Sequence, residues 1–189
     1  MARLYNLGFN HHSTAYYPAR EALEDIQPGV VTLELSLFTK QIKDHIGGLF
    51  EWEVEVFDDI EHHLADMNRN SGEVTAAIVY ARRNNLPVYC IDETDIPVEE
   101  VIRYNLTAIE DSRQLSNDEM DEEYFDRGTM RSRNAYMALA LDFLVGLYPD
   151  EDFAHIGGRY HVMLDNPDRA RPIQQLVRKF DDAEGRMIT

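Results

Sequence analysis

Short apolar segments alternate with longer amphipathic ones along this chain. The short segments are compact and rich in β-branched residues, so we expect strands at Leu4–Gly8, Val30–Leu37, Leu86–Ile91 and Phe153–Gly157. Between them, apolar residues recur at helical spacing. We expect helices at 18–27, 72–83, 97–109 and 129–147, a mixed helical stretch at 38–67, and an amphipathic C-terminal helix that carries Ile173, Leu176, Val177 and Phe180.

Alternation of strands and helices predicts the fold class. The expected architecture is a single α/β domain over residues 1–189, with a largely parallel sheet flanked by helices. Ligands of such sheets bind beyond the carboxyl ends of the strands. Side chains that follow the predicted strands are therefore the first candidates for a functional site.

Two G-x-x-H steps stand at the ends of the first and last predicted strands. Gly8-Phe9-Asn10-His11 follows the first strand, and Gly158-Arg159-Tyr160-His161 follows the last. Glycine allows a ligand to approach the backbone closely, and histidine suits proton transfer near neutral pH and metal binding. Either histidine alone is typical of a hydrogen-bonded loop residue. The matched pair predicts one site assembled from both ends of the chain.

Charged residues in apolar surroundings extend this site. Glu34 lies within an apolar strand, where an unpaired carboxylate is costly to bury unless strand alternation turns it to solvent. Arg133 continues the apolar stripe of the helix predicted at 129–147, so we expect it to point inward and to need acidic partners. Asn134 beside it is a weaker candidate for binding.

Two further acids are candidates for binding at the same edge of the sheet. Glu73 lies in the first turn of its predicted helix, a position that also favours an acid through the helix dipole. Asp92 follows the third predicted strand, where it is also typical of a turn.

Histidine and carboxylate together suit a divalent transition metal. An incomplete protein shell of these ligands leaves room for an activated water. We predict His11, Glu34 and His161 as ligands of Mn²⁺, Co²⁺ or Zn²⁺, and these three with Arg133 as the catalytic group. Catalysis by histidine as a general base without a metal is the alternative.

Charge and composition limit the classes of partner. The chain has 35 acidic residues against 18 Lys and Arg, a net charge of −17 that repels nucleic-acid phosphates and anionic lipids. An acidic surface with few lysines resembles that of proteins from salt-loving organisms, although a bias toward solubility also explains it. A single cysteine and the lack of a long apolar run predict a cytoplasmic protein without a membrane segment.

The ordered motifs resemble the TraB/PrgY pheromone-shutdown family, which is related to the TIKI metalloproteases and to ChaN-like and erythromycin-esterase-like proteins. The resemblance covers roughly residues 4–165 and is carried by Gly8-x-x-His11, Val31-Thr-Leu-Glu34-Leu, Glu73-x3-Ala77-x3-Ala81, Pro87-Val-x-x-Ile91-Asp92, Arg133-Asn134-x-x-Met137 and Gly157-Gly158-x-x-His161. It implies a TIKI/TraB/ChaN/EreA-like α/β fold and a site built from both histidines, the strand glutamate and the arginine.

Three functions follow from these residues. The first is a metal-dependent hydrolase of a peptide or of a small ester or amide. The second is a non-catalytic module that binds and sequesters a peptide or an anion, and the third is a metal-free hydrolase. The expected partner is a small peptide or small-molecule substrate, and the oligomeric state stays open, with a homodimer plausible.

Overall fold

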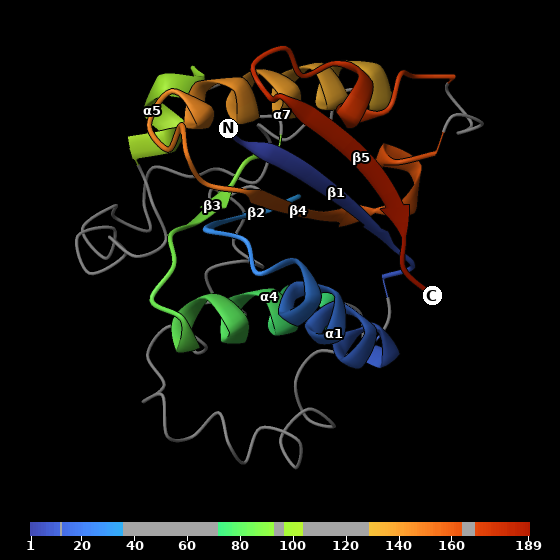
Figure 1. Ribbon diagram of the computed structural model, residues 1–189. Helices are drawn as coiled ribbons and strands as arrows, with labels where there is room; N and C mark the ends of the chain where they lie inside the picture. Colours follow the sequence, from blue (N-terminus) through green and yellow to red (C-terminus); the bar gives the residue numbers. More distant parts are fainter. Residues whose placement is uncertain (12, 36–71, 93–96, 104–128, 164–168) are drawn as a thin grey trace, which may run out of the picture.

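The computed structural model describes residues 1–11, 13–35, 72–92, 97–103, 129–163 and 169–189. Within these residues the chain forms a five-stranded sheet in which every pair of neighbouring strands is parallel (Figure 1). The strand order is β3-β2-β4-β1-β5. The strands are β1 (Arg3–Phe9), β2 (Val30–Leu33), β3 (Val88–Cys90), β4 (Phe153–Gly158) and β5 (Asp182–Met187).

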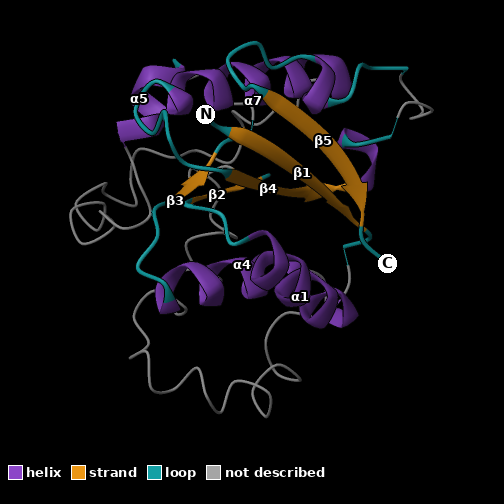
Figure 2. Cartoon of the chain, viewed as in Figure 1, coloured by secondary structure: helices purple, strands orange, loops and turns teal. Residues whose placement is uncertain are grey.

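Helices cover both faces of this sheet. Figure 2 shows α1 (Tyr16–Ile26) and α4 (Gly72–Arg83) on one side, and α5 (Val98–Arg103) and α7 (Met130–Val145) on the other. Short 3₁₀ turns, η1 (Ser13–Ala15), η5 (Arg159–His161) and η6 (Ile173–Gln175), connect the elements. The predicted α/β architecture with a parallel sheet and flanking helices is confirmed.

Each face of the sheet buries its own apolar cluster, because side chains alternate along a strand. Leu7, Leu33 and Ile156 pack with α1 and α4 on one face. Leu4, Val30 and Phe153 pack with the apolar stripe of α7 on the other. The stripe is the one predicted from helical spacing, and its members are fully buried: Met137, Ala140, Leu141 and Leu144.

The predicted C-terminal helix is wrong. Its apolar residues do pack against the face of the sheet that α7 covers, but Ile173 lies in the single turn η6 and the rest lie in coil before β5. The chain then adds β5 beside β1. Spacing could not reveal this strand, because β5 is an exposed edge without an apolar pattern and is held by backbone pairing.

Boundaries of the other elements differ by a few residues. The second strand ends at Leu33 rather than at residue 37, so Glu34 is the first residue beyond it. The described part of the helix expected at 97–109 is α5 (Val98–Arg103). The helical stretch expected at 38–67 lies outside the described residues. In the part of the chain that the structure describes, no helix has the length and apolar character needed to cross a bilayer.

A pair of leucines in α7 tests the packing of this layer. Leu141 is fully buried, whereas Leu139 is 60% exposed. We expect Leu141→Ala to lower the free energy of unfolding by about 2–5 kcal/mol, through lost apolar contact and a residual cavity. Leu139→Ala, the matched control, should change it little. Urea unfolding measures both, and equal losses would contradict the assigned face of α7.

Candidate functional site

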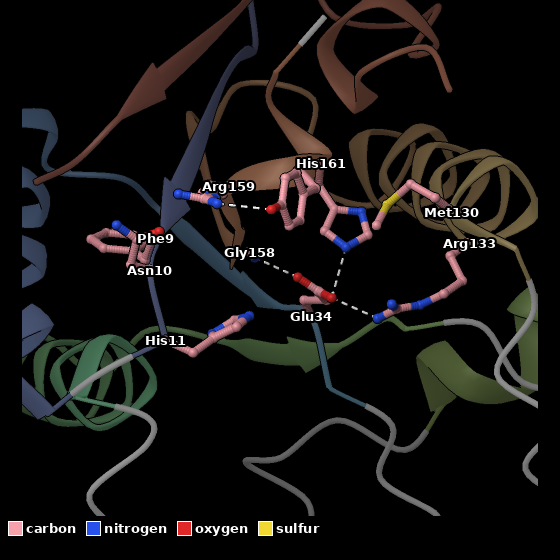
Figure 3. A pocket seen from close by; sticks show the side chains of 10 residues that line it. Phe9, Asn10, His11, Glu34, Met130, Arg133, Gly158, Arg159 and His161 are labelled. Carbon is pink, nitrogen blue, oxygen red and sulfur yellow. Dashed lines mark hydrogen bonds and ion pairs between the residues drawn. The ribbon is translucent and has the colours of Figure 1, made fainter. Parts of the chain in front are cut away.

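The candidate residues meet at the carboxyl-terminal edge of the sheet. His11, Glu34, Asp92 and His161 follow β1, β2, β3 and β4, and parallel pairing brings these four strand ends together. A pocket of about 520 Å³ opens there (Figure 3). Its lining residues are Phe9, Asn10, His11, Glu34, Met130, Arg133, Gly158, Arg159, Tyr160 and His161.

Glu34 is at the centre of the hydrogen bonds in this site. Arg133 Nη2 donates to its Oε1 at 2.5 Å, and Nε2 of His161 lies 2.7 Å from the same oxygen. The backbone N–H of Gly158 donates to its Oε2 at 2.5 Å. Burial opposes the charge on Glu34, but the hydrogen bond and charge of His161, together with Arg133 and Gly158, outweigh it and lower the pKa of Glu34 to about 2.

Arg133 reaches Glu34 from α7 and also binds Asp92. Its Nε and Nη2 donate to the two carboxylate oxygens of Asp92 at 2.9 and 2.7 Å, a bidentate arrangement. The three side chains are 9–13% exposed. The expectation that this arginine points inward to acidic partners is confirmed. Within the described residues Nη1 of Arg133 has no hydrogen-bond partner, so it is a donor available to the pocket.

His161 donates from both ring nitrogens. The Asn134 Nδ2 group donates to the carbonyl of Arg171 at 2.8 Å, and this fixes the amide so that its oxygen faces Nδ1 of His161. An amide oxygen and an ionised carboxylate only accept hydrogen bonds. Nδ1 therefore donates to Asn134, and Nε2 donates to Glu34. Both ring nitrogens of His161 therefore face hydrogen-bond acceptors in this arrangement.

His11 forms a separate pair with Glu73. Its Nδ1 lies 2.6 Å from Glu73 Oε1, and the histidine side chain is 52% exposed whereas the glutamate is completely buried in the first turn of α4. The hydrogen bond to Glu73 raises the pKa of His11, against the effect of burial and with help from the charges of Glu73 and Glu34. Glu73 lies in the first turn of α4, where the helix dipole favours an acid, and it also contacts His11.

Two glycines allow the two groups to approach each other. A Cβ at Gly158 would lie 2.8 Å from His11 Nε2 and 3.3 Å from Glu34 Oε2. A Cβ at Gly157 would lie 2.9 Å from Glu34 Oε2. Contacts below 3.0 Å are repulsive, so a side chain at either position would push the His11 or Glu34 side chain out of its present place. Figure 3 shows Glu34 between His161 and Arg133, with His11 on a different side of Gly158.

A buried polar layer below the pocket escaped the sequence analysis. Asn6, Thr32 and His155 occupy paired positions in β1, β2 and β4, and all three are fully buried. Thr32 Oγ1 lies 2.9 Å from His155 Nδ1, and His155 Nε2 has no partner among the described residues. Burial lowers the pKa of His155 to about 3, so it is neutral. The available signal was a polar residue at the same depth in three strands.

Hydrogen bonding at the site does not suit a divalent metal bound by His11, Glu34 and His161. His161 uses both nitrogens as donors, and Glu34 is already bound by two cations and a backbone N–H. A metal at Glu34 would have to displace them and would lie beside the Arg133 charge. Among the described residues no cluster of three or more His, Cys, Asp or Glu is arranged to hold a metal ion. The metal stays a prediction of the sequence.

Comparisons with known proteins add little to this geometry. No protein-family model and no curated protein matches the sequence. Among solved structures, that of the type III effector HopBA1 is similar over 97% of this chain and 75% of its own, with 14% identity and a TM-score of 0.42.

Removal of the Arg133 charge tests the central ion pairs. We expect Arg133→Met to lower the free energy of unfolding by about 3–5 kcal/mol, because it leaves Glu34 and Asp92 buried without their cation. Arg131 is exposed on the same helix, so Arg131→Met should be nearly neutral. Thermal and urea unfolding of the two variants give the comparison. Similar losses would mean that the buried ion pairs do not stabilise the fold.

Acid titration tests the buried state of His155. Its folded pKa of about 3 lies below the ordinary 6.5, so between these values the unfolded chain binds a proton that the folded protein does not. Stability should therefore fall as the pH falls from 6.5 toward 3. His155→Gln should reduce this slope, most clearly above pH 4.5, the ordinary pKa of a glutamate. Unfolding free energies measured every half pH unit would refute the assignment if both slopes were equal.

Proposed function

We propose that this chain is a hydrolase of esters, amides or peptides in which His11 acts as the general base and no metal is required. The observation that carries the proposal is the pair formed by His11 and Glu73. A completely buried carboxylate holds the Nδ1 side of a half-exposed imidazole at the wall of a pocket. The opposite nitrogen, Nε2, is then left as an acceptor for a proton from water.

The cost of burying Glu73 supports a catalytic role for this pair. Its Oε2 is buried without a hydrogen-bond partner in the described part of the chain. A buried unsatisfied carboxylate oxygen destabilises a fold, so its presence needs a compensating reason. Orientation of His11 and stabilisation of the imidazolium that forms on proton transfer provide one.

Besides a general base, acyl hydrolysis requires positive charge or hydrogen-bond donors near the carbonyl oxygen, and the cationic half of the site supplies them. Attack by water on an acyl carbon places negative charge on the former carbonyl oxygen. Arg133 lines the pocket, and its Nη1 is available as a donor. His161, whose ring nitrogens face Asn134 and Glu34, would supply a second positive charge to the pocket in its protonated form. Glu34 and Asp92 then act as positioning residues that fix both cations.

Membership of the TraB/PrgY family is part of this proposal, because that resemblance rests on the same residues. The erythromycin-esterase-like branch it implies uses histidine as a general base without a metal. Geometry at Glu34 favours that branch over the metal-dependent one.

Kinetics of the His11–Glu73 pair test the proposal. We expect the protein to hydrolyse members of an ester and peptide panel after treatment with EDTA. His11→Gln should lower kcat/KM by about 10²–10⁴-fold, the usual contribution of a general base. The pH profile of kcat/KM should rise through a pKa above 6.5, because the base must lose its proton. Glu73→Gln should lower that pKa, since the hydrogen bond to Glu73 is the main cause of the raised pKa of His11.

Controls distinguish the three functions. Glu24 is an exposed acid on α1, so Glu24→Gln should leave both the rate and the pH profile unchanged. Hydrolysis that appears only with added Mn²⁺, Co²⁺ or Zn²⁺ would favour the metal-dependent enzyme. No turnover under either condition would leave the non-catalytic binding module.

A further inference from the structure

Arg159 differs from the other cations of the pocket in its partners. Arg133 binds Glu34 and Asp92, and His11 binds Glu73. Within the described residues, Arg159 instead donates from Nη2 to the hydroxyl of Tyr160 at 2.8 Å. Its guanidinium also lies 4.7 Å from the centre of that ring. Neither contact neutralises its charge.

No carboxylate lies in salt-bridge distance of the Arg159 guanidinium among the residues that the structure describes. The chain has 35 acidic residues against 18 Lys and Arg, and the other arginine of the pocket lining, Arg133, is paired with two carboxylates. Arg159 lines the pocket directly after the glycine whose N–H binds Glu34 (Figure 3). Its charge is therefore available to a ligand at the place where the proposed reaction occurs.

The turn η5 holds this guanidinium in position. Arg159 and Tyr160 are neighbours in the 3₁₀ turn, and stacking and hydrogen bonding between them restrict the arginine side chain. Restriction before binding reduces the entropy lost when a ligand is held. The arrangement is typical of a preorganised anion site.

We propose that Arg159 binds a carboxylate group of the ligand, so that the substrate is a monoanionic carboxylic acid whose hydrolysed bond lies within the same pocket. Hydrolysis of this substrate rests on the proposed function, whereas binding of its carboxylate by Arg159 does not. One guanidinium pairs bidentately with one carboxylate. A phosphate monoester carries a charge of about −1.5 to −2, which is more than the charge of one guanidinium.

Binding of small probes tests the inference independently of catalysis. The probes are N-acetylglycine, its uncharged amide N-acetylglycinamide, and inorganic phosphate, titrated at low ionic strength with detection by NMR. We expect wild type to bind N-acetylglycine more tightly than either of the others. Arg159→Met should weaken that binding by about 10- to 100-fold, the range expected for a lost charge-assisted hydrogen bond. Arg131→Met, which removes an exposed arginine outside the pocket lining, should leave it unchanged.

Turnover of matched esters separates this inference from the proposed function. Wild type should hydrolyse 4-nitrophenyl hydrogen succinate with a higher kcat/KM than neutral 4-nitrophenyl butyrate, and Arg159→Met should remove the preference. Binding of N-acetylglycine that depends on Arg159, without hydrolysis of either ester, would support the inference and count against the hydrolase. Equal affinity for acid and amide, tighter binding of phosphate, or undiminished affinity in Arg159→Met would each overturn it.

Discussion

The charge of Glu34 is the constraint on which the geometry of the site depends. A carboxylate at the end of a buried strand is unfavourable unless cations and donors surround it. Here α7 supplies Arg133, the turn after β4 supplies His161, and the backbone of Gly158 supplies an N–H. One charge therefore links three segments far apart in sequence. It also explains why Asp92 and Asn134 are needed, since each fixes one of the two cations.

Sequence alone located most of these residues for a simple topological reason. Parallel strands end at the same edge of the sheet, so residues that follow neighbouring strands lie close together. His11, Glu34, Asp92 and His161 each follow one of these strands. The inward direction of Arg133 followed from the apolar stripe of its helix. The contact between His161 and Asn134 could not be predicted, because it depends on how the Asn134 amide is oriented by the backbone carbonyl of Arg171. Edge strand β5 was missed because its stability comes from backbone pairing with β1 rather than from apolar side chains.

Two histidines and a glutamate predict a metal site from the sequence, but the same residue types also form ion pairs. These residue types bind a metal when the lone pairs of the imidazole nitrogens and of the carboxylate point at one ion. They form an ion pair instead when the imidazole nitrogens carry protons and donate them in hydrogen bonds to the carboxylate. The spacing of the residues along the sequence is the same for a metal site and for an ion pair. The guanidinium of Arg133 lies against the carboxylate oxygen that a ligand set would need, which supports the ion pair, and the metal stays a prediction.

In the proposed hydrolase, the two halves of the site would divide proton transfer and charge stabilisation between them. His11 and Glu73 belong to the layer of α1 and α4, whereas Arg133 and His161 belong to the layer of α7, and the glycines at the end of β4 separate them. A base and an electrophile kept apart in this way do not neutralise each other. If all four residues formed a single network, Glu34 would compete with Glu73 for His11 and the imidazole would lose its acceptor nitrogen. The absence of a side chain at Gly158 leaves the space that the His11 ring and the Glu34 carboxylate occupy on that backbone, and in the proposed reaction it would keep the base and the cations in one pocket without a direct pair between them.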